Sequence, residues 1–164
     1  MNLKREVRSA SLKNILICIA ISLGAGAFSP LLFYNGDYYF QLTKPVFALN
    51  VSAFIFIRTV MLILAGFAAG IVVGNCDSCR KRRRFKGIIL ALALLILNFI
   101  FYPVFFLWNS LLFATLLSLI IAIVSFFTAR MFVKVSILSG LIMLLYTFWT
   151  VYGIILNFCL MIVN

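Results

Sequence analysis

The chain has 164 residues, of which 66% are hydrophobic, and its formal net charge is +11 without any His. A mean hydropathy of +1.23 lies outside the range of soluble domains. Acid–base catalysis needs a titratable side chain within hydrogen-bond reach of the substrate, yet the carboxylates Glu6, Asp37 and Asp77 all lie outside the long apolar stretches. We therefore predict no catalytic residue and no required cofactor.

Apolar stretches long enough to span a bilayer make up most of the chain. A helix that rises about 1.5 Å per residue needs roughly 20 apolar residues to cross about 30 Å of hydrocarbon. We predict an all-α integral membrane protein, in which residues 1–164 form a single domain built as a five-transmembrane-helix bundle. The predicted spans are Asn14–Tyr34, Val51–Gly74, Gly87–Leu107, Leu111–Ala129 and Val135–Val163.

The first span has the layout of a cleavable signal peptide. Basic residues precede an apolar run from Ile15 to Leu23, and small residues follow at 24–27, where a signal peptidase would cut. Apolar character nevertheless continues to Phe33. This continuation favours a span that is retained.

Arg58 is a charged residue well inside the second predicted span. A charge at such a depth costs about 2.5–3.5 kcal/mol on insertion scales, so it usually faces a cavity or a partner. Arg58 also lies only roughly 10 Å from the outer end of the span, within reach of lipid headgroups. Both orientations stay open, and Asn98 and Asn157 in later spans likewise need hydrogen-bond partners, such as neighbouring helices.

Three glycines follow Arg58 in the second span. Gly66, Gly70 and Gly74 form two overlapping G-x-x-x-G units. Small residues at this spacing allow two helix backbones to approach closely. The pattern predicts helix packing, either inside the bundle or across a homodimer.

The cysteines do not point to a metal site. Cys18 and Cys159 fall in predicted spans, where a thiol behaves as a small apolar group. Cys76 and Cys79 form a C-x-x-C pair, which is the spacing of redox pairs and of half a zinc site. The chain has no His and no second cysteine pair nearby. A reduced pair in a loop is therefore favoured, and a thiol oxidoreductase is the alternative.

Basic residues alternate between the connections of the predicted spans. They precede the first span and lie between spans two and three and between spans four and five, whereas Lys44 is the one basic residue of the remaining connections. The positive-inside rule then places the N-terminus in the cytoplasm and the C-terminus outside, which fits a bacterial inner membrane. The cluster Arg80–Lys86 also suits anionic lipid or nucleic acid. Its place in the alternation favours topology, so we predict the lipid bilayer as partner and no nucleic acid.

Three stretches resemble the signatures of one family. They comprise Tyr38, Tyr39, Lys44, Pro45, Phe47, Phe54, Thr59 and residues 66–69; then Asn98, Phe101, Tyr102, Pro103, Phe105 and Phe106; then Leu145, Tyr146, Trp149, Leu156 and Asn157. In this order and spacing they resemble the translocator proteins, also called TspO or tryptophan-rich sensory proteins, over essentially the whole chain. The chain departs from the family pattern at Arg58 and Phe101, where the family has Trp.

The resemblance implies a five-helix bundle, often a homodimer, that binds porphyrin or haem between its helices for transport, sensing or regulation. Carried over by position, the pocket lining is Leu31, Phe54, Arg58, Asn98, Phe101, Phe113, Tyr146, Trp149, Gly153 and Leu156. Aromatic walls with a few polar groups suit a large planar ligand, and Arg58 suits a porphyrin propionate. A sterol is less favoured, because the proposed sterol motif needs a basic residue after a Tyr and none follows Lys134.

Two further functional questions stay open at this point. The chain also fits a membrane interaction protein that acts through helix packing and oligomerisation without a small-molecule ligand. Light-dependent porphyrin turnover is thought to require, in some family members, the Trp that Arg58 replaces, so the resemblance does not settle whether the protein is an enzyme.

Overall fold

The computed structural model describes residues 12–33, 41–45, 47–74 and 81–164, and within them every long element is a helix. The helices are α2 (Leu12–Phe33), α4 (Val51–Gly74), α5 (Lys81–Phe106), α6 (Leu111–Val133) and α7 (Ile137–Val163). All five are long and apolar enough to cross a membrane. The predicted all-α bundle of five spans is confirmed for the described residues.

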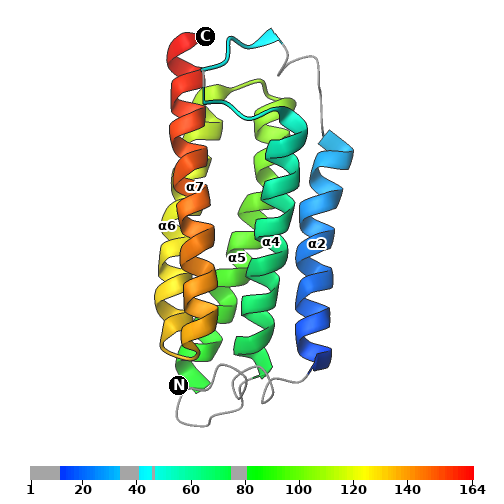
Figure 1. The fold of residues 1–164 in the computed structure, drawn as a ribbon, viewed down its shortest axis with the longest axis vertical. Coiled ribbons are helices and arrows are strands. Elements are labelled where there is room, and N and C mark those ends of the chain that lie inside the picture. Colours follow the sequence, from blue (N-terminus) through cyan, green and yellow to red (C-terminus); the bar gives the residue numbers. More distant parts are fainter. Residues whose placement is uncertain (1–11, 34–40, 46, 75–80) are drawn as a thin grey trace.

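The helices run side by side along the long axis of the molecule (Figure 1). α2 lies at one edge and packs mainly against α4 and also against α5, while α6 and α7 pair closely on the other side. The Ser29 hydroxyl donates a hydrogen bond to the Phe99 carbonyl at 2.8 Å and so ties α2 to α5. With α2 at the edge, the interior with the buried polar cluster lies between the other four helices, α4, α5, α6 and α7.

The helix ends differ from the predicted span ends. α5 begins at Lys81 rather than Gly87, and α6 continues to Val133 rather than Ala129. Hydropathy marks the hydrocarbon layer, whereas Lys and Arg are good helix formers that extend a helix beyond it. α7 begins at Ile137, because Ser136 caps it by accepting a hydrogen bond from the Ser139 amide at 3.4 Å.

Gly66 and Gly70 lie where α4 packs against α2 of the same chain. A Cβ at Gly66 would lie 2.8 Å from the Cys18 carbonyl oxygen, and one at Gly70 would lie 2.6 Å from the Ile15 Cα. These two glycines thus serve packing inside the bundle, and a homodimer stays a prediction. Gly74 is the last residue of α4.

The outer surface of the bundle is apolar, and most of its described charges gather at one end. Large apolar side chains on the lipid-facing side include Ile96, Phe148 and Ile162, which are 61%, 73% and 66% exposed. Because successive helices alternate in direction, the basic residues of α2, α5 and the α6–α7 connection meet at one end and Lys44 lies at the other. This is a multi-pass integral membrane protein; its orientation stays a prediction.

Candidate functional site

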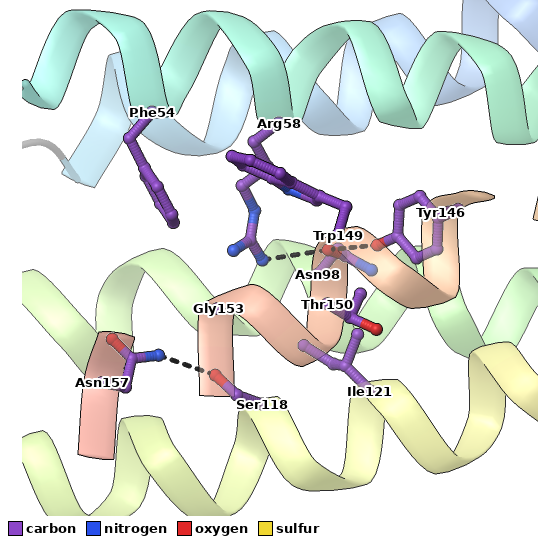
Figure 2. Close-up of a pocket in the computed structure, with 10 residues that line it drawn as sticks. All are labelled: Phe54, Arg58, Asn98, Ser118, Ile121, Tyr146, Trp149, Thr150, Gly153 and Asn157. Carbon is purple, nitrogen blue, oxygen red and sulfur yellow. Dashed lines mark hydrogen bonds between the residues drawn. The ribbon is translucent and has the colours of Figure 1, made fainter. Parts of the chain in front are cut away.

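Arg58 points into the bundle rather than towards the headgroups. It lies in α4 and is only 8% exposed, and its Nη2 donates a hydrogen bond to Asn98 Oδ1 at 2.9 Å. Figure 2 shows the side chain reaching from α4 into the space between the helices. Of the two orientations that the sequence allowed, the structure has the inward one.

Asn98 is the centre of a buried hydrogen-bond cluster. Its Oδ1 accepts a second hydrogen bond from the Tyr146 hydroxyl at 2.9 Å, and its Nδ2 donates to the Leu94 carbonyl at 2.8 Å. The side-chain oxygen therefore uses both of its acceptor positions. The cluster of Arg58, Asn98 and Tyr146 links α4, α5 and α7 and fixes the guanidinium in place (Figure 2).

Aromatic rings also hold the guanidinium. The Arg58 Cζ lies 4.0 Å from the Phe101 ring centroid and 5.2 Å from that of Tyr102. A cation over a ring face gains about 0.5–2 kcal/mol, with the larger values in dry surroundings. The buried Arg58 Nε has no hydrogen-bond partner among the described residues. No described residue is an acid, so that part of the chain supplies no countercharge.

A cavity lies beside this cluster. The residues that line it come from α4, α5, α6 and α7: Phe54, Arg58, Asn98, Ser118, Ile121, Tyr146, Trp149, Thr150, Gly153 and Asn157. Its aromatic wall includes Phe54 and Trp149, whose ring centroids lie 5.7 Å apart. Tyr152, which is not a lining residue, stacks on Trp149 at 5.2 Å. The volume open to the centre of a water molecule is about 20 Å³, which is room for about one water.

The far side of the cavity carries a second polar pair. Asn157 Nδ2 donates to Ser118 Oγ at 2.8 Å (Figure 2). That hydroxyl in turn donates to the Ala114 carbonyl at 2.8 Å. The pair links α7 to α6. The sequence predicted that Asn98 and Asn157 would bond to neighbouring helices, and both do.

A second, apolar cavity adjoins the first. It is lined by Val51, Phe54, Ile55, Phe101, Tyr102, Phe105, Phe106, Leu156, Asn157 and Leu160. Phe54 and Asn157 line both cavities. Phe101, on which the guanidinium stacks, faces this second cavity. The Tyr102 hydroxyl is buried and has no hydrogen-bond partner among the described residues.

The sequence model of the TspO/MBR family matches residues 15–163, which is nearly the whole chain. The protein belongs to the TspO/MBR family. The resemblance seen in the sequence motifs is thereby confirmed. A comparison with curated proteins finds no match.

The structure of this TspO/MBR protein brings together most of the residues that the sequence assigned to the pocket. Those that line the first cavity are Phe54, Arg58, Asn98, Tyr146, Trp149 and Gly153. Phe101 and Leu156 line the second. That a ligand binds these residues stays a prediction.

Leu31 and Phe113 lie outside both cavities, which corrects their predicted place in the lining. Leu31 is 81% exposed on α2, and Phe113 is 55% exposed on α6. α2 meets the bundle through the face that carries Ser22 and Ser29, both buried, and this turns Leu31 outward. Both side chains instead lie on the outer surface of the bundle.

Four residues that line the first cavity were not among the predicted site residues: Ser118, Ile121, Thr150 and Asn157. Three of them carry a signal. Tyr146, Thr150, Gly153 and Asn157 recur three or four residues apart, which places them on one face of α7. Ser118 is a polar residue in an apolar helix and so marks an inward face.

Hydrogen bonds with Asn164, just after α7, and with Tyr152, within α7, hold the segment before α4. The Thr43 amide donates to Asn164 Oδ1 at 2.8 Å, and Asn164 Nδ2 donates to the Thr43 carbonyl at 3.1 Å. The Tyr152 hydroxyl donates to the Phe47 carbonyl at 3.2 Å. Because Tyr152 stacks on Trp149, this fastening connects the segment to the wall of the first cavity. Cys76 and Cys79 lie outside the described residues.

Proposed function

We propose that this TspO/MBR protein is a membrane receptor that binds tetrapyrroles, porphyrin or haem, within its helix bundle, for transport, sensing or regulation of their level. The observation that carries the proposal is the pair of rings Phe54 and Trp149, which line a cavity with buried polar groups. Tyr152 stacks on Trp149 and supports it. Aromatic faces stack on flat conjugated ligands, and a few fixed polar groups orient them.

A macrocycle needs far more room than one water molecule, so binding must widen the interior. Phe54 lines both cavities, so we expect a change in its side-chain rotamer to join them into one space. Trp149 is only partly buried; it stacks on Tyr152 and contacts Phe54 at a tilt of 38°. We expect a planar ligand to take the place of one of these ring contacts rather than to enter a preformed hole.

Trp fluorescence can report on the cavity alone, because the chain has only 2 Trp residues and one of them, Trp149, lines the cavity. Trp108 is 69% exposed beyond α5, so Trp108→Phe leaves Trp149 as the reporter and Trp149→Phe leaves Trp108. Detergent-purified Trp108→Phe protein should show saturable quenching by protoporphyrin at micromolar concentrations. The absorbance shift of the bound porphyrin should weaken in Trp149→Phe and persist in Trp108→Phe. Porphyrin and haem titrations without saturation in the parent would overturn the proposal.

The small free volume of the cavity favours a second candidate, a membrane interaction protein without a small-molecule ligand. In that case the cluster of Arg58, Asn98 and Tyr146 serves only to hold the helices together. The two candidates separate by thermal unfolding in detergent. Excess protoporphyrin raises the melting temperature of a receptor by mass action, and it leaves that of an interaction protein unchanged.

A further inference from the structure

The charge on Arg58 has no anionic partner in the part of the chain that the structure describes. The chain has 3 acidic residues, and Glu6, Asp37 and Asp77 all lie outside the five helices. Arg58 is nevertheless only 8% exposed, and its Nε has no hydrogen-bond partner among the described residues. A charge within a membrane span is costly and marks a functional site with a partner.

The groups that contact the guanidinium orient it without neutralising it. Asn98 Oδ1 is a neutral acceptor that is shared with the Tyr146 hydroxyl, and the Phe101 and Tyr102 rings cover the guanidinium face. The head group is thus held in one position before any ligand arrives. Such preorganisation lowers the cost of binding an anion.

The fixed cation of Arg58 lines the first cavity, and the adjoining second cavity is mostly apolar. Phe101, whose ring contacts the guanidinium, lines the second cavity. Apart from Asn157 and the Tyr102 hydroxyl, the side chains of the second cavity are aliphatic or aromatic. A ligand that fills both spaces would have an anionic end and an apolar body.

We propose that Arg58 is a carboxylate-binding residue and that the site selects planar apolar acids over neutral molecules of the same shape. A carboxylate matches a guanidinium because two parallel N–H···O bonds form between them, and it would supply the partner that Nε lacks. This inference rests on the proposed function and names the class of ligand that the same site prefers.

The test compares protoporphyrin with its dimethyl ester, which has the same ring system and no charge. The parent should bind the diacid about tenfold or more tightly than the ester, the ratio typical of one charge-assisted hydrogen bond. Arg58→Leu should bind the two ligands equally, whereas Arg58→Lys should keep part of the preference. Arg58→Leu should still fold, because replacing an uncompensated buried charge by an apolar side chain removes a desolvation cost.

The outcomes distinguish this inference from the proposed function. If the parent and Arg58→Leu bind diacid and ester equally well, tetrapyrrole binding stands and the carboxylate role is wrong. If no porphyrin binds, the same comparison is made with pyrenebutyrate and its methyl ester. A preference for the acid that Arg58→Leu abolishes would then support the inference alone, and its absence would overturn it. Displacement of the acid by phosphatidylglycerol in mixed micelles would instead assign Arg58 to a lipid phosphate and also overturn it.

Discussion

The Arg58 guanidinium carbon lies 4.0 Å from the centroid of the Phe101 ring. In the family pattern that this sequence resembles, both positions hold Trp. The two departures from the pattern are therefore in direct contact, and together they replace two indoles by a cation on the face of a ring. The pair is a coherent change in the chemistry of the cavity.

Asn98→Asp should give Arg58 an internal counter-ion. We expect this variant to be more stable than the parent, because the new carboxylate forms an ion pair with the guanidinium. It should also lose the preference for the porphyrin diacid over its ester, since the guanidinium is no longer free to bind a ligand carboxylate. Thermal unfolding in detergent and the paired titrations measure these two effects.

The matched control is Asn98→Asp in an Arg58→Leu background, where the same carboxylate is buried and unpaired. Breaking a buried ion pair in this way costs about 3–5 kcal/mol, so the effect of Asn98→Asp on stability should reverse its sign. Equal effects in the two backgrounds would show that the two side chains do not interact.

The five helices were predictable because the bilayer makes each span nearly autonomous. A segment in hydrocarbon must satisfy its own backbone hydrogen bonds, so apolar runs of sufficient length identify the helices. The inward placement of Asn98, Tyr146 and Asn157 follows the same logic, since polar groups avoid lipid. The orientation of Arg58 did not follow from the sequence, because its long side chain could also have reached the headgroups. Hydropathy does not show where a helix ends. The start of α5 at Lys81, before its apolar part, was therefore not predicted.

Which face of an apolar helix points inward was not predictable in the same way. Lipid tails are as apolar as Leu or Phe, so no hydrophobic force sorts such side chains between interior and exterior. Leu31 and Phe113 were placed by resemblance alone, with no polar neighbour on the same face to fix the helix rotation. Both turned out to be exposed. Leu156, in contrast, lies next to the inward-facing Asn157 in the chain, and only 2% of its surface is exposed.

Gly70→Ala should destabilise the bundle, because the added Cβ would lie 2.6 Å from the Ile15 Cα and force α2 away from α4. Overpacking of this kind typically costs about 1–3 kcal/mol. Gly24→Ala is the matched control, because no other side chain lies within 4 Å of a Cβ at that position. Ala there should be neutral or stabilising by up to about 1 kcal/mol through helix propensity. Thermal unfolding that ranks the two variants in the opposite order would contradict the packing seen here.

Asn164→Ala should speed the exchange of ligand. The substitution removes both hydrogen bonds to Thr43 and so loosens the segment that precedes α4, while the cavity residues are untouched. Stopped-flow fluorescence with protoporphyrin should give faster association and faster dissociation, with Kd changed by less than about threefold, which is under 1 kcal/mol. Tyr152→Phe removes the contact to Phe47 and should act in the same direction. Val163→Ala, at a neighbouring position that is 51% exposed, serves as the control and should leave both rates unchanged.

The end of the bundle that gathers the basic residues should face the cytoplasm. A variant whose only cysteine is Cys76, between α4 and α5, should resist a membrane-impermeant maleimide in intact cells and react after lysis. Ser110→Cys in a cysteine-free background places the thiol at the opposite end, where the Ser110 side chain makes no capping hydrogen bond. That thiol should react in intact cells. The reverse labelling pattern would mean that the charge bias around Arg82–Lys86 serves something other than topology, with anionic lipid as the first partner to test.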